Sequence, residues 1–555
     1  MSFHLTPLDI TVFALYMLAV LAVGIWASRL AKRTKRDYFL AGDRLAWWMI
    51  GGSIVASNIS SHHLVGAMGV AYSRGFVAMT IEWGAILIGL NALLWVFLPF
   101  YLRNGFYTMP EFLQRRFSGA ARTVYAVLVL LTYLFVEISA VLCLGALAIY
   151  QLLGVPVMVS VVVLAVVTGV YTIAGGLRAV VWTEMLQLVV LLLGGIALSI
   201  ATIQAVGGPA AVWEMSDQWH LLLPADDPDF PWTMYLGGVL CISVFYCAAN
   251  QFIVQRALAA KNEWHARMGV VFTDYLKFLI PLVIIVPGMV APKLFPNLER
   301  PDVVFPLLVE RLLPSGLVGL VMAGLIAAVM SHISGAVNSC TTIATIDLYL
   351  PWKQRRVRRR ASEKAIAGFD TETERTVQEA GRHAPALSGD DAQAVRFGRM
   401  FGVVTILFGI FWAEVLTGMT ERPIFVYLYN AYGYFTPGIA TMFLLGIFWK
   451  RTTHAGALAA GLLTIPLTLA FDLLLPEMPF LNRTGIVFWL CMGTCVVVSL
   501  MTRPKPAEAI AGLIWNRESL ALPPELKAKM RGLRNPTLWW ALITAAVLFF
   551  YMRFP

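Results

Sequence analysis

The sequence predicts an all-α protein that crosses a membrane with about fourteen helices. Of its 555 residues, 59% are hydrophobic and 13% are charged, whereas soluble domains average about 25% charged residues. Apolar stretches of about 18 residues or more recur from one end to the other, and each can cross a hydrocarbon core of about 30 Å as a helix. The six cysteines lie inside these stretches without metal-site spacing, so we expect them to be small packing residues.

The expected helices follow from the apolar stretches in order. They cover about residues 8–28, 47–71, 76–101, 121–151, 156–175, 181–206, 235–258, 269–292, 315–349, 399–419, 424–448, 455–475, 483–502 and 536–553. The segment 351–398 is polar and lacks apolar periodicity, which predicts a flexible linker. The segment 503–535 is rich in Pro and Lys, and we expect a short amphipathic helix near 524–532 within it.

Basic residues gather on alternate connections, at 29–36, 103–122, 256–267, 353–360 and 450–451. The connection at 207–234 is acidic instead. Basic loops stay in the cytoplasm, so this pattern predicts that both termini lie outside it. The first helix lacks a signal cleavage site and is expected to be a retained span. The net charge of +10 therefore indicates orientation rather than nucleic-acid binding, and the run KQRRVRRR at 353–360 is interpreted as a topology determinant rather than a lipid site.

Six polar side chains occupy the seven positions of SNISSHH, residues 57–63, inside an expected span. An unpaired polar group in hydrocarbon costs several kcal/mol, so such residues face a bundle interior or a water-filled cavity. Glycines at 51, 52, 66 and 69 allow the backbone to open. A broken helix exposes carbonyl groups that can bind a cation. The alternative is a polar seam that holds two helices together.

The motifs along the chain resemble those of the sodium/solute symporter family, in its sodium–glucose cotransporter branch, as a bacterial member. They are SNISSHHLVGAMG (57–69), TIAGGLRAVVWTEMLQ (172–187), NQFIVQRALAAKN (250–262), DYLKFLIPLVIIVPGM (274–289), MSHISGAVNSCTTIATIDLY (330–349) and FLLGIFWKR (443–451). The resemblance implies a LeuT-like inverted repeat of five plus five helices. The repeats would span 47–206 and 235–448, with the linker 351–398 inside the second and the outer loop 207–234 between them. The segment 1–46 would add one helix and a basic loop, and 449–555 would add three accessory helices.

By resemblance, a substrate cavity would be lined by Asn58, His63, Glu82, Ser243, Tyr246, Lys277, Tyr429 and Asn430. Tyr246 also matches the inner-gate aromatic of the family. Glu82 and Lys277 are intramembrane charges, which are costly without a role. The chain departs from the glucose branch at Cys247, where that branch has tryptophan, and at Tyr429, where it has glutamine. The implied solute is therefore a sugar, polyol or sugar acid, rather than glucose in particular.

By resemblance, the shared sodium site of the family matches Ala56, Ile59, Ala328, Ser331 and His332, and Glu184 matches an acid near the cytoplasmic cation exit. The family has a hydroxyl where this chain has His332, and histidine titrates near neutrality. Three versions follow: sodium coupling with a rearranged shell, proton coupling through His332, or uncoupled transport. A histidine turned away into a hydrogen bond would leave the other four sodium ligands in place. Glu137 is interpreted as structural.

The favoured function is a secondary active transporter that imports a small hydroxylated solute by alternating access and is coupled to a cation gradient. Its expected partners are a sugar-like solute, a cation (Na⁺ in the family) and the lipid of the cell (inner) membrane, with no nucleic acid and no organic cofactor. A transporter-like sensor is a more remote alternative, because we expect no signalling module after the last span. A channel would show acidic rings or filter loops, and an enzyme would show a nucleophile, a base and an orienting group. The sequence contains neither pattern.

Overall fold

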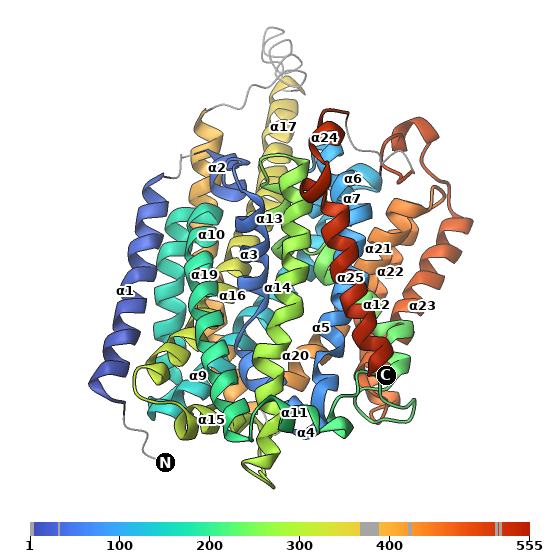
Figure 1. Ribbon diagram of the computed structural model, residues 1–555. Coiled ribbons are helices and arrows are strands. Elements are labelled where there is room, and N and C mark those ends of the chain that lie inside the picture. The colour runs from blue at the N-terminus through green and yellow to red at the C-terminus, as the bar shows by residue number, and fades with distance from the viewer. Residues whose placement is uncertain are drawn as a thin grey trace.

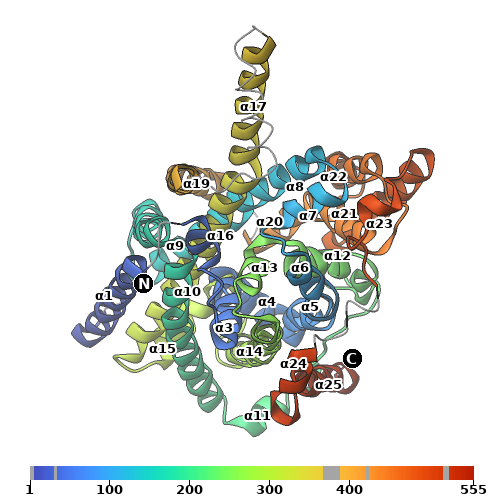
Figure 2. The same ribbon diagram turned by 90° about the horizontal axis from the view of Figure 1, so that it is seen from above.

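The computed structural model describes residues 5–30, 34–366, 388–419, 424–516, 520 and 524–554. Within these ranges the chain is almost entirely helical and contains no β-strand. Eleven helical stretches are long and apolar enough to cross a membrane. Figure 1 shows the long helices standing side by side, and Figure 2 looks down on the bundle that they form. The predicted fold class, an all-α polytopic membrane protein, is confirmed.

The helices of the first expected repeat are α3 (Trp47–Asn58), η1 (His62–Ala67), α4 (Met68–Arg74), η2 (Gly75–Met79), α5 (Thr80–Ala85), η3 (Ile86–Leu90), η4 (Leu93–Phe97), α6 (Leu98–Asn104), α7 (Met109–Arg116), α8 (Gly119–Thr132), η5 (Tyr133–Ile138), α9 (Ser139–Leu153) and α10 (Val157–Ala205). Those of the second are α12 (Gly238–Val244), η8 (Phe245–Ala249), α13 (Gln251–Leu258), α14 (Glu263–Val290), α15 (Val304–Leu312), α16 (Leu317–Ile343), η11 (Ala344–Tyr349), α17 (Leu350–Ile366), α19 (Ser388–Met419), α20 (Ile424–Gly433) and α21 (Thr436–Phe448). The remaining named helices are α1 (Pro7–Leu30), α2 (Lys35–Leu40), α11 (Pro209–Trp213), α22 (His454–Leu474), α23 (Phe480–Met501), α24 (Pro524–Lys529) and α25 (Pro536–Arg553). Figure 2 shows α1, α23 and α25 at the edge of the bundle, and α3, α4, α13 and α14 near its centre.

The helix α10 contains two of the expected spans, and the chain turns between them at Gly176. Gly176 has a φ of 59°, and a Cβ atom there would lie 2.3 Å from the carbonyl oxygen of Tyr38. Tyr171 and Thr183, on either side of the turn, both pack around Gly24 of α1. Positions five residues before and seven residues after Gly176 thus reach the same level of α1, so the two spans run back along each other.

The first helix of each expected repeat is broken near its middle. In the first repeat α3 ends at Asn58, and Ile59 is extended at φ −80° and ψ 126°. In the second, η8 ends at Ala249, and Asn250 is extended at φ −92° and ψ 124° before α13 begins. The predicted break in the first core helix is confirmed, and each break frees backbone carbonyl groups inside the bundle.

The expected flexible linker at 351–398 is helical at both of its ends, which corrects that prediction. Its residues 367–387 lie outside the described part of the chain. Contacts between α17 and α19 explain the order at the two ends: the rings of Tyr349, next to α17, and Phe397 stack with centroids 4.1 Å apart, and Lys353 Nζ donates to Gln393 Oε1 over 2.5 Å. The expected short helix near 524–532 is present as α24.

Figure 1 shows α2 and α17, which belong to the basic connections, and α24, from the segment 503–535, at one end of the bundle. The first residue of α1 and the last residue of α25 lie toward the opposite end. This arrangement agrees with the predicted orientation, and the side of the membrane that each end faces stays a prediction.

Candidate functional site

Two small cavities lie between the broken helices. They measure about 50 and 20 Å³ and share four lining residues, Asn58, His63, Glu82 and Lys277. The walls of the larger cavity also include His62, Ile81, Ala85, Ile242, Ser243, Tyr246 and Tyr432. Cavities of this size hold a few water molecules. A sugar-sized solute therefore needs a wider arrangement of the same walls.

Glu82 is the centre of a charged cluster in the cavity wall. Lys277 Nζ donates a short hydrogen bond to Glu82 Oε2, and His63 Nε2 lies 3.2 Å from Glu82 Oε1. The N–H of Ser60 donates to His63 Nδ1 over 3.3 Å. Because Nδ1 accepts that bond, the ring proton is on Nε2 and points to Glu82. The cluster joins helices of both repeats, since Glu82 and His63 belong to the first and Lys277 to the second.

The break itself contributes a second histidine, which was not predicted as a site residue. Ser60 Oγ lies 2.5 Å from His62 Nδ1, and the rings of His62 and His63 have centroids 3.8 Å apart. His62 lines the larger cavity beside His63. Both histidines belong to the polar stretch 57–63, so the composition of that stretch was the signal that could have identified His62.

The helix α20 lines the larger cavity through Tyr432 rather than through the expected Asn430. Asn430 Oδ1 accepts from Arg483 of α23 over 3.1 Å, outside the walls of both cavities. The side chain of Tyr429 lies outside the described part of the structure. Positions 429 and 432 share a helical face, so spacing from Tyr429 was the signal that could have identified Tyr432. The ring of Tyr432 meets that of Tyr246 at 89°, with centroids 6.2 Å apart.

Three of the oxygen atoms predicted for the cation site converge beside the first break. Ser331 Oγ donates to the carbonyl oxygen of Ala56 over 2.7 Å and lies 3.0 Å from that of Ala328. Ser331 is buried. The neighbouring Ile59 is the extended residue of the break, so its carbonyl is not committed to a regular helix. Carbonyl and hydroxyl oxygens at an unwound helix are the donors that sodium uses in transporters of inverted-repeat fold.

The imidazole of His332 is bound elsewhere. Its Nδ1 lies 2.7 Å from the carbonyl oxygen of Ser57, and its Nε2 lies 2.6 Å from Glu137 Oε2. A carbonyl only accepts, so Nδ1 carries a proton and Nε2 faces the Glu137 carboxyl group. The second oxygen of that group accepts from the Tyr432 hydroxyl over 2.5 Å. Glu137 therefore joins His332 to the wall of the larger cavity, a connection that the sequence analysis missed.

Glu184 belongs to a separate buried cluster on α10, α3 and α13. It accepts from Ser57 Oγ over 2.5 Å and from Arg256 Nη2 over 2.6 Å, and it also bonds Ser53 Oγ. The side chains of Glu184 and Arg256 are 0% and 1% exposed, so their charges balance each other away from water. Ser57 links this cluster to His332, because its hydroxyl meets Glu184 and its carbonyl meets the imidazole.

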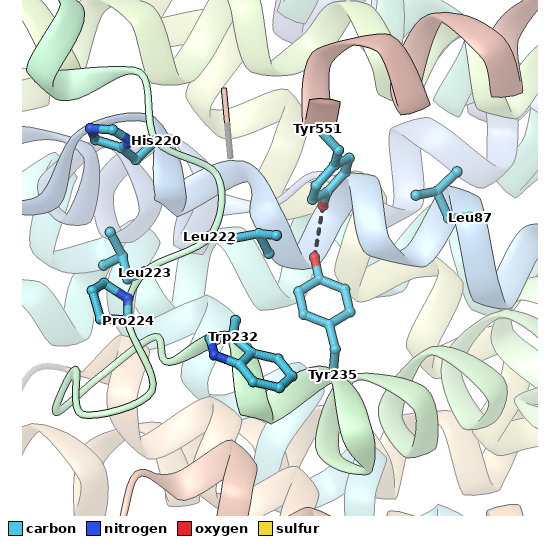
Figure 3. A pocket seen from close by; sticks show the side chains of 8 residues that line it. All are labelled: Leu87, His220, Leu222, Leu223, Pro224, Trp232, Tyr235 and Tyr551. Atoms are coloured by element: carbon cyan, nitrogen blue, oxygen red, sulfur yellow. Dashed lines mark hydrogen bonds between the residues drawn. The ribbon is translucent and has the colours of Figure 1, made fainter. Parts of the chain in front are cut away.

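A larger pocket of about 720 Å³ lies apart from these groups, between η3, the loop before α12 and the last helix. Figure 3 shows Tyr235 and Tyr551 pointing toward each other across it, with their hydroxyl oxygens 2.7 Å apart. Leucines, a proline and Trp232 form most of its wall. Because the tyrosine hydroxyls are already bonded, this pocket offers few donors or acceptors to a hydroxylated solute.

Comparison with known proteins places these observations in a family. The model of the sodium:solute symporter family matches residues 38–371 and 388–464. The chain is similar to a "Sodium/glucose cotransporter" of Vibrio parahaemolyticus, at 33% identity over 90% of this chain and 91% of that protein. It is also similar to a "Sodium/myo-inositol cotransporter 2" of Oryctolagus cuniculus, at 35% identity over 92% of this chain and 79% of that protein.

A solved structure shares the fold. It is titled "Substrate-bound outward-open state of a Na+-coupled sialic acid symporter", and it superposes with a TM-score of 0.76 at 20% identity, over 90% of this chain and 98% of that one. The named relatives are transporters, which confirms the prediction that the chain is not an enzyme. With many apolar helices and a family match over most of its length, the protein is a multi-pass membrane protein and belongs to the sodium:solute symporter family.

Proposed function

We propose that this protein is a secondary active transporter that imports a small polyhydroxylated solute, of the sugar or polyol class, with a sodium gradient. Two relatives at 33% and 35% identity carry the names of sodium cotransporters of glucose and of myo-inositol. The solutes in those names are neutral and rich in hydroxyl groups.

The observation that carries the solute class is the cluster of Glu82, Lys277 and His63 in the cavity wall. A carboxylate accepts hydrogen bonds from hydroxyl groups, and an ammonium group donates to their oxygens. Since Lys277 already balances Glu82, a solute does not need to bring a charge. The rings of Tyr246 and Tyr432 in the same wall offer apolar faces to the C–H groups of a sugar or cyclitol. This arrangement favours a neutral polyol over a sugar acid.

The position of His332 supports sodium among the three coupling versions. Its two hydrogen bonds, to Ser57 and Glu137, occupy both ring nitrogens, while the oxygens of Ala56, Ala328 and Ser331 contact one another. Those oxygens, with the carbonyl of Ile59, would supply four ligands of the kind that a hard cation requires. Proton coupling through the His332–Glu137 pair is the second candidate, because the two groups face each other at 2.6 Å.

The two sites can act on each other because the same broken helix contributes to both. Ala56 and Ile59 belong to the candidate cation site, while Asn58 and His63 line the solute cavity. A cation at the break would fix the position of α3 against α16 and of η1 against the cavity. Cation binding would then strengthen solute binding, and solute binding would strengthen cation binding by the same factor. The corresponding coupling free energy is about 1–3 kcal/mol in typical coupled systems.

Uptake of tritiated myo-inositol and D-glucose into proteoliposomes tests the solute class. We expect Glu82→Gln and Lys277→Met each to reduce equilibrium binding and uptake at least about tenfold, the equivalent of about 1.4 kcal/mol. Breaking a buried pair also destabilises a protein, by about 3–5 kcal/mol. The double variant therefore serves as the control for folding: it should regain thermal stability and remain unable to bind solute. Lys293→Met, near the end of α14, should behave as the wild type.

The proposal would be wrong if either single variant bound the solutes with wild-type affinity. A double variant that regained both stability and binding would show that the Glu82–Lys277 pair is structural.

A further inference from the structure

The helix α14 carries a second buried carboxyl group, Asp274, which the solute site described above does not use. Asp274 is 0% exposed. Neither of its oxygen atoms has a hydrogen-bond partner among the described residues, and it is the only buried carboxyl group there with both oxygens unpartnered. Buried polar groups in native proteins nearly always have partners, because an unpaired one costs free energy. An unpaired acid inside a membrane bundle therefore indicates a role in another step.

The placement of Asp274 suggests that role. It precedes Lys277 by three residues, so the two share a helical face, with Asp274 about 4.5 Å nearer the start of α14. That start lies toward the end of the bundle where α2 and α17 are found in Figure 1, the predicted cytoplasmic end.

Lys277 thus stands between two carboxyl groups. It bonds Glu82 on the cavity side. Asp274 lies about one helical turn nearer the predicted cytoplasmic end, and its oxygens have no hydrogen-bond partner among the described residues. The ammonium group sits on a flexible four-carbon stem, which allows it to reach acceptors in more than one direction. A charge with two alternative partners gives a protein two discrete arrangements that a ligand can bias.

We propose that Lys277 exchanges Glu82 for Asp274 as the inner side opens, and that this exchange releases the solute into the cytoplasm. The inference rests on the proposed function. While Lys277 bonds Glu82, the cavity is neutral and offers both a donor and an acceptor. Once Lys277 moves to Asp274, the solute loses a donor and faces an unbalanced carboxylate, so its affinity falls. Asp274 is a positioning residue in this step, because it acts on the solute through Lys277.

Two substitutions at Asp274 test the exchange, because one should slow net uptake and the other should weaken equilibrium binding. Asp274→Asn keeps the shape and removes the carboxyl group with which Lys277 would pair. We expect equilibrium binding of tritiated myo-inositol to stay within about threefold of the wild type while net uptake slows at least about tenfold. Asp274→Glu is longer by one methylene and should draw Lys277 from Glu82 before the inner side opens. Its equilibrium binding should weaken about tenfold. Asp302→Asn, the same change in the loop before α15, should leave both measurements unchanged.

Thermal stability distinguishes this role from simple packing. If Asp274 were structural, both variants would weaken binding and lower the melting temperature together, and that result would overturn the inference. Wild-type net uptake by Asp274→Asn would overturn it as well. Failure of the unmodified protein to take up either solute would overturn the proposed solute class and the exchange with it. Normal uptake by the wild type, with no effect of either Asp274 variant, would remove the exchange alone.

Discussion

At the residue scale, the coupling ion depends on where the His332 side chain points. The imidazole bonds the carbonyl of Ser57 and the carboxyl group of Glu137, while the hydroxyl of Ser331 stays with the carbonyls of Ala56 and Ala328. In the proposed sodium site, His332 would therefore remove one hard ligand, while the oxygens of Ala56, Ala328 and Ser331 would remain.

A serine at position 332 should restore that ligand. In His332→Ser we expect the sodium concentration for half-maximal uptake to fall about tenfold, because a hydroxyl oxygen joins the four oxygens already available. Loss of the imidazole would leave Glu137 with Tyr432 alone, so the double variant His332→Ser/Glu137→Gln avoids a buried unpaired acid. Initial uptake rates against sodium concentration provide the measurement. Unchanged sodium dependence in both variants would show that position 332 is remote from the site.

Part of this site was predictable from single residues. Glu82 and Lys277 stand out because charges within apolar stretches are costly, and both line the same cavity. The partner of His332 was not predictable, because Glu137 lies 195 positions away and only the packing of η5 against α16 brings the two together. Asp274 was not predictable as a site residue either, because its lack of a hydrogen-bond partner is a property of the folded bundle.

At the element scale, two helix breaks define the site. The extended residues Ile59 and Asn250 interrupt the first helix of each expected repeat. The segment η8 ends one residue before the second break and brings Tyr246 to the cavity wall. The ring of Tyr246 lies edge-on to that of Tyr432. The centroid of the Tyr246 ring lies 6.3 Å from that of the Phe252 ring in α13. Tyr246 thus contacts both the cavity and α13, the half-helix nearer the predicted cytoplasmic end.

If Tyr246 is the inner gate, its ring matters more for closure than for affinity. We expect Tyr246→Ala to reduce concentrative uptake about tenfold or more and to weaken equilibrium binding by less than about threefold, since the open path lets solute leak back. Tyr246→Phe retains the ring and is the matched control, with uptake near the wild-type level. Equal losses of uptake and binding in Tyr246→Ala would indicate that the tyrosine is a binding or packing residue only.

Hydropathy located the helical elements well because apolar length is a strong signal. It could not resolve the turn within α10, which depends on the conformation of Gly176. It also missed the order at the ends of the segment 351–398, where α17 and the first turns of α19 are polar and contacts such as the stacked rings of Tyr349 and Phe397 hold them in place.

At the scale of the whole molecule, the candidate solute site and the candidate cation site meet at one broken helix. Ser57, within that helix, contacts both His332 and Glu184, so the candidate cation site connects to the buried ion pair of Glu184 and Arg256. Coupled transport requires that neither ligand alone lets the bundle change the side to which it opens. We therefore propose that sodium binding at this helix is coupled to solute transport.

Accumulation of tritiated myo-inositol in proteoliposomes tests that claim most directly, with a sodium gradient and a proton gradient imposed separately. With an inward sodium gradient and equal pH on both sides, we predict that the solute accumulates at least about tenfold. With an inward proton gradient in sodium-free choline buffer, we predict that the solute equilibrates across the membrane and does not accumulate. Accumulation driven by protons without sodium would contradict the claim and would assign the coupling to the His332–Glu137 pair. Equilibration under both gradients would contradict it too, because the protein would then be an uncoupled carrier.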